Sequence, residues 1–394
     1  MKYSKLYVIV TCLYFIVGMG GADDYRTVVD SRGVSVEMPT EIERVATISG
    51  GLVEGVMTAL DEQDKIVGLG HRALRMKFNY TYETIDGNTY YYKNGMNPVT
   101  YLNPQMMELP LFADSNSINY ESLASLEPDL VILRCGCGIL KYPDDENTQK
   151  TIETIESLDI PVVVLYAPGF ADELDTETIS NEIRIIGQIF GKDQDAETLC
   201  HYLESQIDLV ADKTDDIPDD EKQRVLILGL SSLARDNGGA GNVMGTDTMD
   251  SYFIEEVVNA KNAYQETGWL AMISVEHILA LNPDVIVLCT SYGYHPPNEL
   301  YSAPYYQNIQ ELDAIKNEQV WALPWTPSNA AKRLEYPIDV MVIAKAAYPG
   351  LFEDIDLGEW LLDFYMNVYN VDRYTAKELR SAQWMDWTVD ENYA

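Results

Sequence analysis

The chain has few basic residues, few histidines and no long apolar run after its first residues. Its 394 residues contain 27 Lys+Arg against 63 Asp+Glu, which gives a formal net charge of −36. A field of that sign repels phosphate backbones and anionic membranes, so the composition argues against a nucleic-acid-binding protein. Apolar residues still make up 46% and charged residues 23% of the chain, which indicates an acidic globular protein.

Motifs for catalysis are also missing. The chain has 4 histidines and contains no G-x-S-x-G elbow, H-E-x-x-H helix or protein-kinase signature. The glycine-rich segment Gly238–Asn242 lacks the Lys-Ser/Thr pair of a phosphate-binding loop. We therefore expect a protein that is not an enzyme and that holds no cofactor.

The first residues are typical of a secretory leader. Lys2 and Lys5 precede an apolar run over 6–17, and small residues follow as far as Ala22. The run is shorter than the roughly 20 residues that span a bilayer. We predict a signal peptide over residues 1–22. The mature protein is then exported, to the cell surface or to a periplasm-like space.

Cysteines are too few after this leader for a disulfide scaffold. Cys135 and Cys137 form a C-x-C pair that could contact a ligand or a soft metal ion. No second pair and no histidine spacing follows them, so the zinc signal is weak. A cysteine-based protein that binds zinc or iron remains an alternative at this stage.

One unit of the sequence occurs twice, with an offset of 155 residues and no gap. Residues 119–133 and 274–288 each begin with a helix-capping residue, Asn119 or Ser274. A short helix then ends before a Pro-Asp pair, because the residue before proline resists the helical conformation. Each unit closes on an apolar run suited to a strand buried on both faces. The repeat predicts two similar α/β lobes.

The remaining pattern agrees with two lobes and a helical connection. Strands alternate with helices in both halves, which predicts parallel sheets. Residues 176–214 are helical in pattern, with a break near Gly191. The predicted fold class is α/β, with two similar Rossmann-like lobes, 23–175 and 215–394, joined by a long linker helix. Such a helix is stiff, so we expect only modest movement between the lobes.

The sequence resembles the substrate-binding proteins of ABC importers, in the branch that binds iron complexes and vitamin B12. The segments that carry the resemblance are 27–36, 43–46, 119–133 and 274–288. It covers nearly all of the mature chain and implies the helical-backbone periplasmic-binding-protein fold. Two stretches depart from the family, the tyrosine-rich residues 78–109 and the last residues 373–394.

The resemblance implies a function and partners. The protein would capture a metal chelate, a ferric siderophore or haem, and deliver it as a monomer to an ABC permease and its ATPase. A corrinoid is the alternative cargo, and a surface adhesion or sensory module is an alternative of another class. Glu121 and Glu276 match the two lobe glutamates that meet arginines on the permease. The simpler interpretation is that each only complements its helix dipole.

In this family the ligand lies between the lobes at the carboxyl ends of the strands, as in other open α/β sheets. Arginines there could pair with ligand oxygens, and aromatic rings could stack on a planar cargo. The candidate cleft residues are Arg72, Tyr101, Arg134, Cys135, Cys137, Tyr166, Tyr292, Tyr294, His295, Trp325 and Arg333. The tyrosines of 78–109 either contact the cargo or cover a lobe surface.

Overall fold

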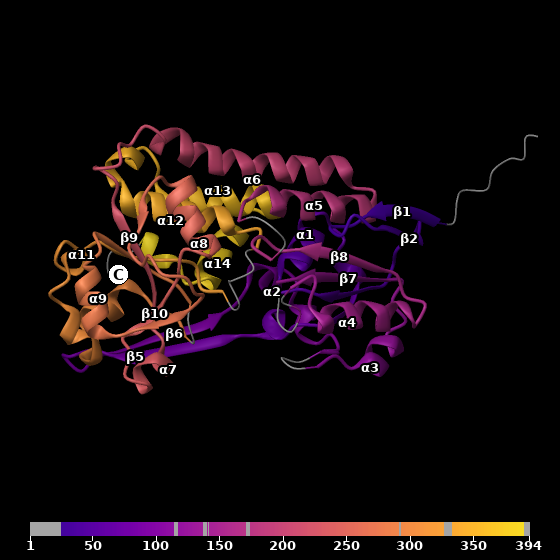
Figure 1. Cartoon of the computed structure of the whole chain (residues 1–394), viewed down its shortest axis with the longest axis horizontal. Helices are drawn as coiled ribbons and strands as arrows, with labels where there is room; N and C mark the ends of the chain where they lie inside the picture. Colours follow the sequence, from indigo (N-terminus) through magenta and orange to yellow (C-terminus); the bar gives the residue numbers. More distant parts are fainter. Residues whose placement is uncertain are drawn as a thin grey trace, which may run out of the picture.

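Two larger β-sheets with helices around them form the two lobes (Figure 1). Two hairpins add to them, β1 (Tyr25–Val29) with β2 (Ser35–Pro39) and the tyrosine-rich hairpin described below. The computed structural model describes residues 25–113, 117–136, 140, 142–170, 174–290, 293–326 and 333–389. The predicted leader lies outside these residues. Within them, no helix combines the length and the apolar character that crossing a membrane requires. The predicted α/β class with two sheets is confirmed.

The first sheet is wholly parallel. Its strands, in spatial order, are β4 (Ile66–Leu69), β3 (Val45–Ile48), β7 (Leu130–Cys135) and β8 (Val162–Tyr166). Alternate residues of β7 enter two different cores, which explains its unbroken apolar run. One core contains α1 (Leu52–Ala59) and α5 (Glu177–Phe190), and the other contains α3 (Tyr120–Ser125) and α4 (Glu146–Glu156).

The second sheet is mixed. Its parallel strands are β11 (Lys261–Asn262), β9 (Arg224–Gly229), β13 (Val285–Leu288) and β14 (Val320–Ala322). The antiparallel edge that the sequence analysis missed consists of β10 (Gly241–Val243) and β12 (Ala271–Ile273). The link from β9 to β10 holds only the short helix α7 (Ser232–Asp236), and a parallel crossover needs a longer connection.

The sequence repeat is also a structural repeat. The Asn119 side chain accepts a hydrogen bond from the Ser122 amide at 2.9 Å and caps α3. Ser274 accepts one from the His277 amide at 3.2 Å and caps α9 (Val275–Leu281). The predicted helix starts are therefore confirmed in both lobes.

The Pro-Asp pairs of the repeat fasten neighbouring strands. The Asp129 carboxylate accepts from the Arg44 amide at 2.9 Å, just before β3. The Asp284 carboxylate accepts from the Arg224 amide at 2.8 Å, at the start of β9. Each aspartate also donates its own amide to the carbonyl of the same arginine, at 2.8 and 2.9 Å. The repeat thus sets strand register in the same way twice.

The helical linker consists of α5 and α6 (Asp193–Thr214). Gly191 ends α5 with a left-handed φ of 65°, and a side-chain carbon at Gly187 would lie 2.4 Å from Ala196. The two helices therefore pack closely against each other. The longer helix, α6, extends along the top of the molecule over both lobes (Figure 1).

The tyrosine-rich segment is a β-hairpin of β5 (Phe78–Glu83) and β6 (Thr89–Gly95) that reaches from the first lobe across the second (Figure 1). Asn298 donates a 2.8 Å hydrogen bond to the Tyr82 hydroxyl, and the Ile85 amide donates to the Ser302 carbonyl at 2.9 Å. Of the two interpretations, the hairpin tyrosines fit a covering of the second lobe.

Of the last three helices, the first packs on the strands of the second lobe and the other two reach the first lobe. They are α12 (Tyr336–Ala347), α13 (Leu357–Tyr369) and α14 (Arg373–Ala382). Nearly every residue of α12 is buried, α13 packs on α1 and α6, and α14 packs on α2 (Pro98–Leu102). The end of the chain, which departs from the family pattern, is thus a further connection between the lobes.

Candidate functional site

The carboxyl ends of strands from both sheets meet at one place between the lobes. Gly51 follows β3, His71 follows β4, and Trp325 and Thr326 follow β14. Asn97 caps α2 from the first lobe, and Arg333 precedes α12 in the second. We call these six residues the junction site: Gly51, His71, Asn97, Trp325, Thr326 and Arg333.

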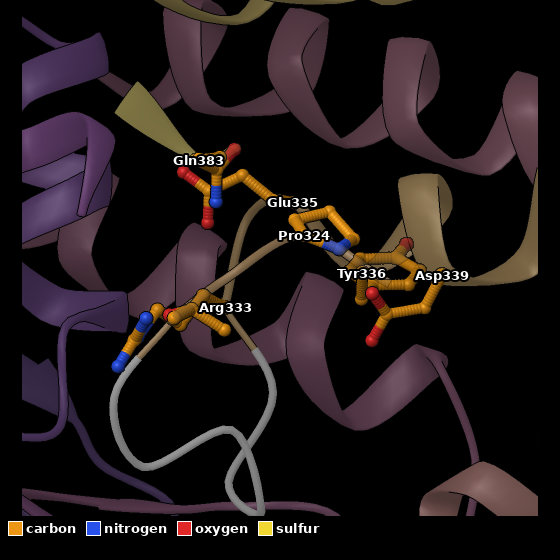
Figure 2. Close-up of a pocket in the computed structure, with 7 residues that line it drawn as sticks. Pro324, Arg333, Glu335, Tyr336, Asp339 and Gln383 are labelled. Atoms are coloured by element: carbon orange, nitrogen blue, oxygen red, sulfur yellow. The ribbon is translucent and has the colours of Figure 1, made fainter. Parts of the chain in front are cut away.

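Arg333 reaches from the second lobe to the first. Its side chain is 4% exposed, and its Nε donates a 2.8 Å hydrogen bond to the Gly50 carbonyl. Figure 2 shows the guanidinium pointing away from the carboxyl groups of Glu335 and Asp339 and toward the ribbon of the first lobe. A permanent positive charge is therefore held inside the contact between the lobes.

Gly51 allows this close approach. Its φ is 122°, and a side-chain carbon there would lie 2.7 Å from Arg333 Nε and 3.2 Å from Asn97 Nδ2. Only glycine fits, because it lacks that carbon and tolerates the positive φ. The same residue precedes α1, so the positive end of the helix dipole also faces the junction.

The electrostatic environment of His71 shows the sign of the local field. Burial, and after it the positive charges of Arg333 and Arg72, lower the pKa of His71 to about 4. Its Nδ1 accepts the Ala73 amide at 3.2 Å, so the proton of the neutral ring lies on Nε2. The junction is thus a positive region within a chain of net charge −36.

Three donors at the junction have no acceptor. Asn97 Nδ2, Trp325 Nε1 and Thr326 Oγ1 are buried, and within the described parts of the chain none has a hydrogen-bond partner. Buried polar groups are almost always paired in folded proteins. Donors without acceptors, beside an arginine, are suited to a ligand that is rich in acceptor oxygens.

Two buried carboxyl groups, those of Glu54 and Glu335, lie near Arg333. Glu54 accepts the Thr47 hydroxyl, and Glu335 accepts the Tyr369 hydroxyl. Burial raises the pKa of both, although Arg333 pulls in the other direction. Burial thus favours the neutral form of each carboxyl group.

Beside the junction lies a small cavity of about 10 Å³. Its lining residues are Pro324, Thr326, Arg333, Glu335, Tyr336, Asp339 and Gln383 (Figure 2). That volume has room for about one water molecule. The lobes are thus closed on each other here, and a larger ligand would need them to separate.

Arg134 and Cys135 lie in the interior of the first lobe. Arg134 forms a two-pronged ion pair with Glu182 of α5, at 2.6 and 2.7 Å, and both side chains are 1% exposed. Cys135 is fully buried, and burial raises the pKa of its thiol to about 12. The structure therefore does not bring either residue to the junction. Cys137 lies outside the described residues, as does Tyr292.

The other predicted aromatic residues support the fold. The Tyr294 hydroxyl donates to the Trp384 carbonyl at 2.7 Å, and His295 lies 3.6 Å from Glu299, which also accepts Tyr80 of the hairpin. Tyr101 is half-buried with Glu378 of α14 nearby, and Tyr166 is half-buried at the end of β8. Among the described residues no His, Cys, Asp and Glu cluster suits a metal ion.

Of the site residues predicted from sequence, Arg72, Trp325 and Arg333 lie at or beside the junction, and their part in ligand binding stays a prediction. The other four junction residues, Gly51, His71, Asn97 and Thr326, were not predicted. The glycine pair between a predicted strand and helix was a usable signal, as was Asn97 before Pro98. Nothing local to either residue indicates that Arg333 lies opposite.

The predicted docking residues are both exposed. Glu121 lies in the first turn of α3, and Glu276 lies in the equivalent turn of α9. The Glu276 backbone amide and the Ser274 hydroxyl lower the pKa of Glu276. The two acids thus occupy matching positions on the two lobes.

Two α/β lobes, a helical connection and a polar site at opposed strand ends define a two-lobed solute-binding protein. The profile of the family described as "Periplasmic binding protein" matches residues 52–326. The chain belongs to this family, which confirms the resemblance seen in the sequence. It is a solute-binding protein of an ABC transporter, whose partners are a membrane permease and an ATPase.

Known relatives agree on the class and differ in cargo. The molybdate-binding protein MolA of Haemophilus influenzae is 24% identical over 391 residues, covering 94% of this chain and 97% of that protein. Its molybdate-bound structure gives a TM-score of 0.65 at 21% identity, covering 88% of this chain and 98% of that one. A periplasmic solute-binding protein of Veillonella parvula gives 0.70 at 22% identity, with coverages of 92% and 98%. A periplasmic haem-binding protein of Pseudomonas aeruginosa gives 0.53 at 19% identity, with coverages of 79% and 94%.

Proposed function

We propose that this exported binding protein captures an oxyanion of the molybdate class at the junction site. The observation that carries the proposal is the junction itself. A buried arginine lies there with Asn97 and Thr326 nearby, and Asn97, Trp325 and Thr326 each carry a buried donor without an acceptor, in a chain that otherwise carries strong negative charge. An anion with several oxygens would accept these hydrogen bonds and offset the charge of Arg333.

Similarity to a molybdate-binding protein along nearly the whole chain supports this cargo. The metal chelates expected from the sequence, a ferric siderophore, haem or a corrinoid, form the second candidate. Similarity to a haem-binding protein favours them. Against them stand the hairpin tyrosines, which are used in packing. The cavity holds about one water molecule, so either cargo needs the lobes to separate. A chelate would require a much wider separation of the lobes.

As a solute-binding protein of an ABC transporter, the protein would deliver its ligand to the membrane permease. The loaded protein would dock on its permease through Glu121 and Glu276, which are exposed at matching sites of the two lobes. Carboxylates at such a rim would pair with arginines and set the orientation of docking. The cysteine-based and adhesion alternatives have no comparable support in the described residues.

The test is a thermal-shift and calorimetric screen of the mature protein. The ligands are molybdate, tungstate, sulfate, phosphate, a ferric siderophore, haemin and cobalamin. A ligand that binds only the folded state raises the melting temperature in proportion to ln(1 + [L]/Kd). We expect molybdate or tungstate to raise it, and Arg333→Gln to remove the effect. Arg184→Gln, on the linker, is the matched control and should keep it.

A rise with a chelate and with no oxyanion would replace the first candidate by the second. A response that survives Arg333→Gln unchanged would place the ligand elsewhere in the molecule.

A further inference from the structure

Two consecutive carbonyls near the end of the chain hold the two halves of the junction site. The Met96 amide, next to Asn97 of the first lobe, donates to the Ala382 carbonyl at 3.0 Å. The Trp325 amide of the second lobe donates to the Gln383 carbonyl at 2.9 Å. Residues 382–384 therefore join backbone from both lobes directly behind the site.

Side chains of the same segment fill the space between these bonds. Trp384 is 2% exposed, and its ring centre lies 5.3 Å from that of Trp325. A side-chain carbon at Gly95 would lie 2.6 Å from the Trp384 ring, so the hairpin backbone rests on the indole. The Trp384 Nε1 donates to the Lys93 carbonyl at 3.1 Å. The indole is thus packed between β6 and the residue that follows β14.

Gln383 completes the segment. It is 1% exposed, lines the cavity beside Arg333 and accepts the Tyr365 hydroxyl of α13. The segment lies beyond residues 52–326, the part of the chain that matches the family. The residues of the junction site mostly follow strands of the two sheets. The site also depends on residues 382–384, near the end of the chain.

We propose that residues 382–384 are a positioning element of the ligand site. Trp384 keeps the segment in place, and its carbonyls hold Asn97 and Trp325 at a fixed separation across the lobes. These residues touch no ligand in this scheme. They act through the residues that do, and their effect on affinity rests on the proposed function.

The first measurement needs no ligand. Hydrogen exchange is followed at the Met96 and Trp325 amides in the full chain, in Trp384→Leu and in Trp387→Leu. Trp387 is the matched control, because it belongs to the same end of the chain but packs on Trp321, with ring centres 5.6 Å apart. Local opening of the segment should speed exchange of both amides together, by about tenfold, in Trp384→Leu alone.

If only one amide responds, or if both tryptophan variants behave alike, the positioning inference is overturned. Trp384→Phe is included in case Trp384→Leu does not fold. It keeps a ring against Gly95 and loses the hydrogen bond to the Lys93 carbonyl. We expect it to retain most of the protection at both amides. Equal loss of protection in Trp384→Phe and Trp384→Leu would assign the effect to that bond and not to ring packing, which contradicts the proposal.

The second measurement uses molybdate as the probe in calorimetry. We expect Trp384→Leu to weaken its affinity about tenfold through misplaced donors, with Trp387→Leu close to the natural chain. If the natural chain does not bind molybdate, the proposed cargo fails, while the exchange data still decide the positioning inference. If molybdate binds equally well to Trp384→Leu, the positioning inference fails and the cargo stands.

Discussion

The Nε of Arg333 donates a 2.8 Å hydrogen bond to the carbonyl of Gly50, a residue 283 positions earlier in the chain. This bond joins the second lobe to the start of α1 in the first. A guanidinium has five N–H donors in a planar fork, and Nε is the one that makes this bond. The proposed anion would therefore bind beside a direct contact between the lobes.

Gly51→Ala should affect the ligand site as well as the backbone. The new carbon would lie 2.7 Å from Arg333 Nε and would displace the guanidinium. Gly33→Ala is the matched control, because Gly33 has a φ of 73° and nothing within 4 Å of the added carbon. Urea unfolding should show a loss of about 1–2 kcal/mol in the control from the positive φ. Calorimetry with molybdate should show lost affinity only in Gly51→Ala. Equal affinities in the two variants would contradict this geometry.

Arg134→Met should damage the fold and leave the ligand site intact. The Arg134–Glu182 pair is buried, and removing one partner of such a pair costs about 3–5 kcal/mol because a buried charge is left alone. The double variant Arg134→Met with Glu182→Met should recover most of that stability, as apolar replacements of buried pairs do. Chemical denaturation gives the stabilities. A stable Arg134→Met protein that has lost its ligand would restore the cleft role expected from the sequence.

The parts of the fold that were predictable from sequence are those set by neighbouring residues. The helix starts at Asn119 and Ser274 depend on a cap and on residues within one turn. The strands of both repeat units depend on short apolar runs. Such signals are complete within about ten residues, so no knowledge of the rest of the chain is needed.

The contacts that could not be predicted from sequence depend on distant partners. Arg134 lies at the end of a predicted strand, where a ligand-binding arginine could lie. It forms an ion pair with Glu182, 48 positions later in the chain. Tyr82 and Tyr294 carry the aromatic surface that a planar cargo would need, yet they bind the hairpin to the second lobe. Spacing along the chain does not show whether such a side chain contacts a ligand or a distant residue of the same chain.

The two Pro-Asp aspartates should differ in their effect on stability. Asp129 accepts two backbone amides, those of Glu43 and Arg44, whereas Asp284 accepts the Arg224 amide. Each bond to a charged acceptor contributes about 1.5–3 kcal/mol, and less where water reaches it, as it does here. We expect Asp129→Ala to lower the free energy of unfolding more than Asp284→Ala. Urea titrations of the two variants test this, and the reverse order would contradict the prediction.

His71 should make the fold weaker in acid. Its pKa is about 4 in the folded chain and about 6.5 when unfolded, so the unfolded chain binds more protons between these values. The free energy of unfolding therefore falls as the pH drops from 6.5 to 4, by up to about 3 kcal/mol. His71→Asn keeps an acceptor for the Ala73 amide but does not titrate there. The difference between the natural chain and the variant should develop within that window. A difference that is constant with pH would contradict the assignment.

Reversing the charge at both docking acids should stop delivery without affecting capture. In Glu121→Arg with Glu276→Arg, permease arginines would meet like charges, and repulsion at a rim slows association. Both side chains are exposed and remote from the junction, so the affinity for the ligand should not change. The matched control is Glu146→Arg with Glu177→Arg, which reverses two other exposed first-turn glutamates, on α4 and α5. Uptake is measured in vesicles that contain the permease and its ATPase. Loss of uptake in both double variants would indicate a general charge effect, and normal uptake in the first would remove Glu121 and Glu276 from the docking surface.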